Sequence, residues 1–348
     1  MDVGRRHRSF RGEIICMRRF SVEPEEYELL KAACEATAAS HPDLQRSQRE
    51  SPDESAKSIE DEISGFLGAI WQDRKTVYDS AEQALQPLCL LYDLALLQVC
   101  DLSHFGLKNA HHRSRVIWPE AQLPVQPSPN AVFYVLASNL AQSMQAFRLL
   151  VLHGFEGQAR ATFRGVIETA DLLIMVLASE ATYREFIKSF EDPSESYKHW
   201  RSHLSPSKIR AAVSLLEDDD PLSIPIDQTP NEVRKDMYQW LSNFVHVNFV
   251  AHIVAAHPED FAGNSRPLAM LGDVGEASRA TLAHGLLYLW ITLLRIEKLL
   301  WEQHCWKGFR GKRSRKWFKY RCRALDELFL SYLPTYWEKN PVAGTQSI

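Results

Sequence analysis

The sequence predicts an all-α protein, a bundle of long helices with a smaller N-terminal helical region. Apolar residues recur about every 3.6 residues in nearly every periodic segment, and no segment shows the sustained alternation of a half-buried strand. Helix starts are also clearly marked. Thr229-Pro230-Asn231-Glu232 and Ser51-Pro52-Asp53-Glu54 each combine an N-cap residue, a proline and the glutamate of a capping box. With 348 residues, the chain can bury a sizeable core.

The expected elements follow from these signals in chain order. We expect a basic N-terminal arm at 1–20, an N-terminal helical region at 21–102, a proline-bearing linker at 103–130, a helical bundle core at 131–304, a basic aromatic helix at 305–335 and a tail at 336–348. The linker is assigned because structureless stretches of this length are usually linkers or functional. The expected helices lie near 23–39, 54–70, 71–100, 131–153, 155–178, 181–191, 194–203, 206–217, 230–256 and 274–304.

The charge is distributed unevenly along the chain. The formal net charge is −4, which gives no overall attraction to nucleic acid, yet the stretch 307–323 holds nine Lys/Arg and no acidic residue. Aromatic residues interleave with these bases, a combination that suits single-stranded RNA or another polyanion. An ordinary helix that packs its aromatics inward fits equally well. The expected nucleic-acid-binding residues are Arg310, Lys312, Arg313, Arg315, Lys316, Trp317 and Lys319.

The remaining composition points to a reducing compartment and to no cofactor. The six cysteines form no CxxC pair, and the N-terminus lacks the apolar stretch of a signal peptide. The longest clean apolar run, Gly285–Leu294, is too short to span a bilayer. We therefore expect a cytoplasmic protein without a transmembrane segment.

One histidine pair has the spacing of metal ligands. His199 and His203 lie four residues apart, with Glu195 one turn earlier, so the two imidazoles can share a metal ion. The segment is polar and carries no HExxH motif, which favours a solvated helix face. No metal site is assigned on the sequence alone.

A polar trio inside apolar helical sequence is the main candidate catalytic site. Arg164 and Glu168 flank the apolar stripe of 155–177, four residues apart, and His246 lies on a helix that is apolar on most sides. Buried ionisable groups must find partners or change their charge state. The trio can act as a histidine acid/base beside an arginine that stabilises negative charge, as RNA cleavage requires, or as a structural network between packed helices.

The pattern Arg164-xxx-Glu168 followed by Tyr238-xx-Leu241-Ser242-xxx-His246 resembles a family of mostly bacterial helical proteins, the domain of unknown function 5677 group. That family is distantly similar to HEPN domains, many of which are ribonucleases in phage defence and toxin systems. The resemblance implies a defence effector acting on RNA. The chain departs from the HEPN signature, because the nearest arginine before His246 is Arg234, twelve positions back. The alternative is a non-catalytic module that binds a protein partner or forms a homodimer.

Overall fold

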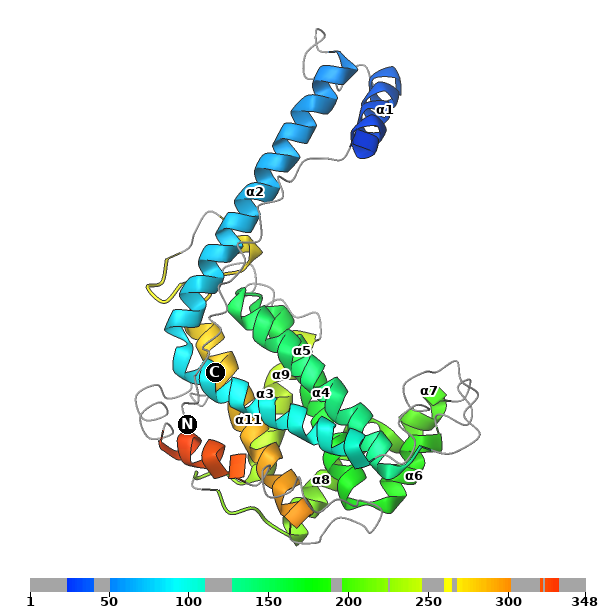
Figure 1. Cartoon of the computed structure of the whole chain (residues 1–348), viewed down its shortest axis with the longest axis vertical. Helices are drawn as coiled ribbons and strands as arrows, with labels where there is room; N and C mark the ends of the chain where they lie inside the picture. The colour runs from blue at the N-terminus through cyan, green and yellow to red at the C-terminus, as the bar shows by residue number, and fades with distance from the viewer. Residues whose placement is uncertain are drawn as a thin grey trace, which may run out of the picture. The chain divides into compact units, whose positions relative to one another are not determined.

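The computed structural model describes residues 24–40, 51–109, 127–188, 196–224, 226–245, 260–264, 268–301, 320–321 and 323–331. These described residues form helices and no strand, which confirms the all-α prediction (Figure 1). The chain divides into two compact units, Met1–Thr76 and Val77–Ile348.

The helices and helical turns have the following bounds: α1 Pro24–Ser40, α2 Pro52–Ala84, α3 Gln86–Asn109, α4 Pro129–Leu152, α5 Glu156–Ala178, α6 Glu180–Lys188, α7 Ser196–His199, the π-helical turn η2 Trp200–Leu204, α8 Pro206–Asp219, α9 Pro230–Val245, the 3-10 turn η3 Ala269–Leu271 and α11 Glu276–Trp301. A further helical stretch covers 323–331.

Both predicted capping boxes are present. The Ser51 backbone N–H donates to the Glu54 carboxylate at 2.8 Å, and the Glu54 N–H donates to the Ser51 hydroxyl at 3.2 Å. The same reciprocal pair joins Thr229 and Glu232 at 2.7 and 3.3 Å. Each box satisfies backbone donors that a helix start leaves unpaired, which is why α2 and α9 begin where the sequence predicts.

The predicted break at residues 70–71 is wrong. α2 continues through Trp71 as one helix of 33 residues, and the interruption comes at Leu85. α3 restarts at Gln86 with Pro87 in its first turn, where the missing proline N–H costs no helical hydrogen bond. The proline, rather than a change in apolar pattern, marks the boundary.

The division between units also differs from the predicted linker at 103–130. It lies between Thr76 and Val77, and α3 belongs to the second unit, where it packs on α4 and α11. Tyr92 is fully buried and its hydroxyl donates to the Met144 carbonyl at 3.0 Å, while Arg148 pairs with Asp93 at 2.6 Å. The apolar face of α3 is therefore part of the main core. Residues 110–126 of the predicted linker lie outside the described residues.

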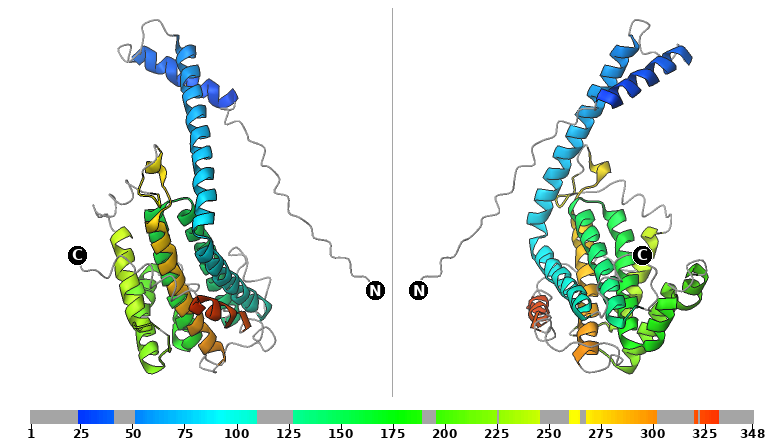
Figure 2. Two further views of the ribbon diagram at one scale, coloured as in Figure 1. Left: turned by 90° about the vertical axis from the view of Figure 1, so that its left-hand side faces the viewer. Right: turned by 45° about the vertical axis from the view of Figure 1, so that its right-hand side comes forward.

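α5 is the central helix of the second unit. It packs against α4, α6, α8, α9 and α11, and Figures 1 and 2 both show it alongside α4 and α11. Its core-facing positions Phe163, Ile167, Ala170 and Ile174 are buried, as the apolar stripe predicts. A helix with neighbours on so many sides must place its polar side chains at helix contacts, and this decides where the site lies.

One segment of α3 has the length and composition of a membrane-spanning helix. Within the described residues, Gln86–Leu107 meets both criteria, and half of it is buried in the helical packing. Core helices have the same composition, so the expectation of no transmembrane segment stays a prediction.

Candidate functional site

The polar stripe of α5 faces the contacts with α8, α9 and α11. Its members are Arg160, Arg164, Glu168 and Asp171, spaced four, four and three residues apart. Each of them interacts with a charged, hydroxyl or aromatic side chain, and three of them do so with side chains of α9. The stripe therefore connects helices.

Asp171 forms the buried end of this stripe. Its Oδ1 accepts hydrogen bonds from Arg234 Nη1 of α9 and from the Tyr288 hydroxyl of α11, each at 2.6 Å. Arg234 Nη1 also donates to the Tyr288 oxygen at 2.9 Å. Asp171 and Arg234 are only 4% and 2% exposed. Burial raises the pKa of the Asp171 carboxyl, and the Arg234 guanidinium opposes that rise.

The ionic network continues to α8. Glu217 of α8 lies 3.7 Å from Arg234 Nη2 and accepts hydrogen bonds from the fully buried Arg295 of α11. Arg295 also pairs with Asp220, just beyond α8, at 3.1 Å. Two buried arginines thus face two buried carboxylates, and this pairing compensates for the loss of hydration. We call Asp171, Glu217, Arg234, Tyr288 and Arg295 the buried network.

The other end of the stripe is also buried. Arg160 Nε donates to Glu156 at 2.6 Å and lies 3.0 Å from the Thr281 hydroxyl of α11. The guanidinium carbon of Arg160 lies 4.4 Å from the ring centroid of Trp240 on α9. Burial raises the pKa of the Glu156 carboxyl, with Arg160 acting against the rise.

Arg164 and Glu168, the predicted site pair, occupy the middle of the stripe. Arg164 Nε donates to Glu168 Oε1 at 3.1 Å within α5, and Arg164 Nη2 donates to the Tyr238 hydroxyl of α9 at 2.7 Å. These two residues and Tyr238 all belong to the motif that carries the family resemblance. His246, the third member of the predicted site, lies outside the described residues.

The Arg164–Glu168 pair is not a buried charge pair. The side chains are 19% and 32% exposed, so water screens the pair. The buried carboxylate of the stripe is Asp171, three residues further along the helix. Spacing along the stripe predicts which residues are polar but not how deeply each is covered.

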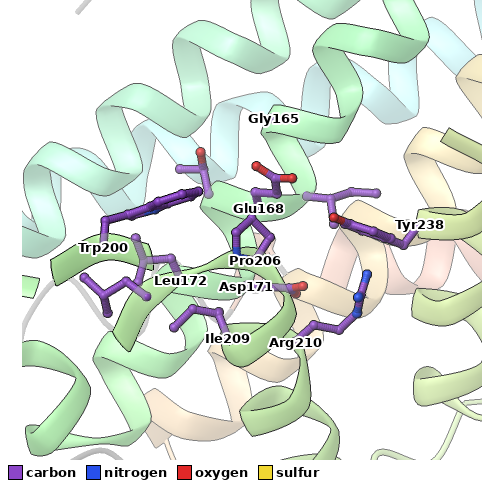
Figure 3. A pocket seen from close by; sticks show the side chains of 12 residues that line it. Gly165, Glu168, Asp171, Leu172, Trp200, Pro206, Ile209, Arg210 and Tyr238 are labelled. Carbon is purple, nitrogen blue, oxygen red and sulfur yellow. The ribbon is translucent and has the colours of Figure 1, made fainter. Parts of the chain in front are cut away.

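A pocket of about 210 Å³ opens beside this pair (Figure 3). It is lined by α5, η2, α8 and α9. Figure 3 shows Arg210 beside Tyr238 at one end, Trp200 at the other and Glu168 between them. The guanidinium carbons of Arg210 and Arg164 lie 3.7 and 4.8 Å from the Tyr238 ring centroid, within cation–π range.

One arginine that lines the pocket has unused hydrogen-bonding capacity. Arg210 is half-buried and forms no ion pair or hydrogen bond with any described residue, although its guanidinium lies over the Tyr238 ring. Arg164 does not line the pocket, and its Nη1, which has no hydrogen-bond partner in the described part of the chain, is buried. By contrast, Asp171 and Glu168 already accept from arginines. The pocket therefore presents the Arg210 donors next to carboxylates that are already paired.

Sequence reasoning missed several of these residues. Arg210, Glu217 and Arg295 were not singled out, and Arg234 entered only through its distance from His246. Arg295 lies in an almost wholly apolar helical run. An ionisable residue in apolar sequence is the same signal that indicated the trio, so it also indicates Arg295. Arg210 carries no such signal, because its helix is amphipathic and half exposed.

Other predicted site residues lie outside the described residues. These are the nucleic-acid-binding set Arg310, Lys312, Arg313, Arg315, Lys316, Trp317 and Lys319, together with Glu195 of the histidine cluster.

No protein-family model, no curated protein and no solved structure matches the chain.

Mutations in the buried network and in the Arg164–Glu168 pair should lower the free energy of unfolding by different amounts. Asp171→Ala leaves Arg234 buried without its closest carboxylate, so it should lower the free energy of unfolding by about 3–5 kcal/mol. Glu168→Ala removes a screened pair on the same helix and should cost roughly 1 kcal/mol or less. Urea unfolding followed by circular dichroism measures both, and equal losses would contradict the assignment of the buried network.

Proposed function

We propose that the protein binds single-stranded RNA, with a phosphate group held by Arg210 at the pocket. The observation that carries the proposal is the Arg210 guanidinium, which lines the pocket and forms no hydrogen bond or ion pair with a carboxylate among the described residues. Guanidinium groups bind phosphate oxygens through charge-assisted hydrogen bonds, with two parallel N–H donors where the geometry allows. Arg164 holds the Tyr238 side chain, on whose ring Arg210 lies, through a hydrogen bond to the Tyr238 hydroxyl.

The aromatic residues at the pocket support a nucleotide as the ligand. Trp200 is exposed and lines the pocket, and Tyr238 lies at the opposite end (Figure 3). Proteins that bind single strands stack bases on such side chains, at about 1–3 kcal/mol per base. Glu168 lies between them with one oxygen paired to Arg164, and its other oxygen can accept from a ribose hydroxyl or a base amino group.

The size of the pocket supports a polymer over a free small molecule. Pockets that enclose a drug-sized ligand measure roughly 300–1,000 Å³. At about 210 Å³, this pocket holds only part of such a ligand. A strand that places one nucleotide in the pocket and continues along the surface fits this volume.

The RNA proposal agrees with the family resemblance and with the expected cytoplasmic location. In it, the basic segment at 307–323 contributes further phosphate contacts, and His246 supplies proton transfer for cleavage of the bound strand. A role in bacterial defence or stress follows from the resemblance to HEPN-related proteins.

Reversing the charge of Arg210 tests the binding site. Arg210→Glu should weaken binding of a short single-stranded RNA about 10- to 100-fold, because charge-assisted hydrogen bonds contribute about 1.5–3 kcal/mol. The slope of log affinity against log salt should also fall by about 0.7 for each lost phosphate contact. Fluorescence anisotropy of labelled RNA across a salt series gives both quantities.

Lys235→Glu is the matched control. Lys235 lies on α9, the helix that carries Tyr238, is exposed, and does not line the pocket. The same change of net charge should leave the affinity within about twofold of wild type, since exposed charges away from a contact are screened. If both variants lose affinity equally, or neither does, the pocket is not the phosphate site.

A second candidate function rests on α2. Its residues Ile59, Ile63, Phe66 and Trp71 are 37–54% exposed, although they form an apolar stripe. The spacings from Ile59 to Ile63 and from Ile63 to Phe66 are four and three residues, the alternation found in coiled coils. The alternative is thus a homodimer in which α2 packs on α2 of a second copy.

The dimer alternative predicts a mass change on mutation. Phe66→Glu should convert a dimer to a monomer, because it places a charge in the apolar seam. Gln72→Glu on an exposed position of the same helix should not change the mass. Analytical ultracentrifugation over a concentration series measures both, and a wild-type chain that is monomeric throughout would rule out this alternative.

A further inference from the structure

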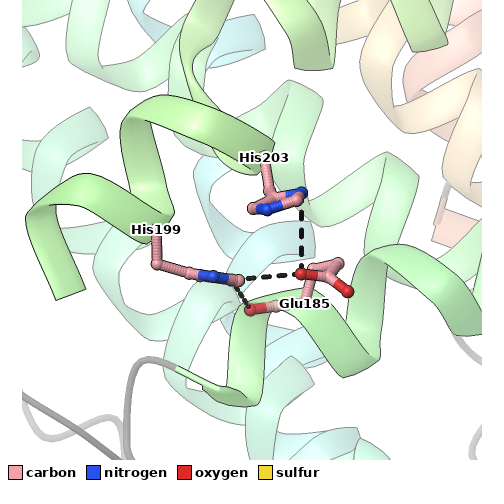
Figure 4. Close-up of side chains that lie close together, drawn as sticks. All are labelled: Glu185, His199 and His203. Carbon is pink, nitrogen blue, oxygen red and sulfur yellow. Dashed lines mark hydrogen bonds and ion pairs between the residues drawn. The ribbon is translucent and has the colours of Figure 1, made fainter. Parts of the chain in front are cut away.

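A second polar cluster lies on α6, α7 and η2, and the RNA proposal does not use it. Figure 4 shows His199 and His203 approaching the same Glu185 side chain from neighbouring turns. His199 Nε2 lies 3.2 Å and His203 Nδ1 3.7 Å from Glu185 Oε2. The three residues can each offer one ligand atom, and these atoms all lie within 4.8 Å of one another.

We propose that Glu185, His199 and His203 bind a divalent transition-metal ion, with Zn²⁺ the best-matched ion. Zinc takes imidazole nitrogen and carboxylate oxygen at about 2.0–2.2 Å in tetrahedral geometry. Ligand atoms at those bond lengths stand about 3.3–3.6 Å apart. The separations of 3.2 and 3.7 Å from Glu185 Oε2 are close to that value.

Glu185 gives an independent reason to infer a ligand. Its two carboxylate oxygens have different surroundings. Oε1 accepts from Lys188 Nζ at 2.5 Å, whereas Oε2, which faces the histidines, is buried and has no hydrogen-bond partner among the described residues. A buried carboxylate oxygen without a hydrogen bond is costly. The two imidazoles beside it balance its charge only when they are protonated, and a bound metal ion balances it when they are neutral.

The histidines remain accessible for metal binding. His199 and His203 are 18% and 51% exposed and their rings stack with centroids 4.7 Å apart. His199 Nε2 also lies 2.8 Å from the Glu185 carbonyl oxygen. A bound ion replaces the proton on that nitrogen, so this hydrogen bond is exchanged for a metal–nitrogen bond.

The local backbone and the ligand count both fit such a site. His203 lies in a π-helical turn, a rare conformation that occurs frequently at functional sites. Three protein ligands leave one tetrahedral position for water, the arrangement of open zinc sites. Trp200, in the same turn, lines the pocket described above. A bound ion would therefore connect η2, which forms part of that pocket, to Glu185 of α6.

Metal titration of the full chain tests this site independently of RNA binding. Isothermal titration calorimetry with Zn²⁺ should show one saturable site per chain. Glu185→Gln and His199→Gln should each lower the affinity by at least about tenfold, since even outer-shell changes cost roughly 10–100-fold. His104→Gln, at an exposed histidine on α3, should leave the affinity unchanged.

Cobalt spectroscopy separates this site from cysteine ligation. With Co²⁺, the wild type should give the visible absorption of a tetrahedral nitrogen–oxygen site without thiolate charge-transfer bands. Circular dichroism verifies that each variant is folded, and the single variants are conservative in size. The proposal is overturned if the wild type binds no ion, if the Glu185→Gln/His199→Gln double variant retains the site, or if the spectrum shows thiolate ligands.

Discussion

The second unit depends on placing two arginines, Arg234 and Arg295, inside its core. Neither can lose its charge, so each must be matched by a carboxylate at hydrogen-bond distance. Asp171 and Glu217 provide that match, and Tyr288 completes the hydrogen bonds around Asp171. Because the four charged residues come from α5, α8, α9 and α11, the charge balance requires these four helices to meet in one register. Apolar packing alone tolerates small slips between helices, whereas a misplaced buried charge does not.

The pocket is a consequence of that register. Asp171 belongs to the network and also lines the pocket, and Arg210 lies two turns before Glu217 on α8. When the network holds α5, α8 and α9 together, it also holds Glu168, Arg210 and Tyr238 around one opening. The two carboxylates that line the pocket are already paired with arginines, whereas Arg210 lies over the Tyr238 ring and forms no ion pair with a described residue. The pocket therefore offers a positively charged donor, although its lining carries two acids and one base.

Much of this organisation is predictable from the sequence, and the rest depends on tertiary contacts. Capping boxes located the starts of α2 and α9, and the apolar stripe of α5 identified its buried residues, since both signals are local. The Arg164–Glu168 pair follows from four-residue spacing on one helix. Burial depth along the stripe does not follow from the sequence, because it is set by α9 and α11, and the predicted site therefore contains Glu168 but not the more deeply buried Asp171. Arg210 and Glu185 were missed because each acquires its neighbours only when helices distant in sequence meet.

Arginine NMR on the isotope-labelled chain tests the central proposal, that Arg210 contacts the phosphate of a bound strand. The Nε–Hε resonances are observed while short single-stranded RNA is added. We predict that the Arg210 resonance shifts and saturates at the RNA concentration that saturates binding. The Arg295 resonance should stay in place, because its Nε–H is buried and donates to Glu217. RNA binding that leaves the Arg210 resonance unmoved would contradict the account.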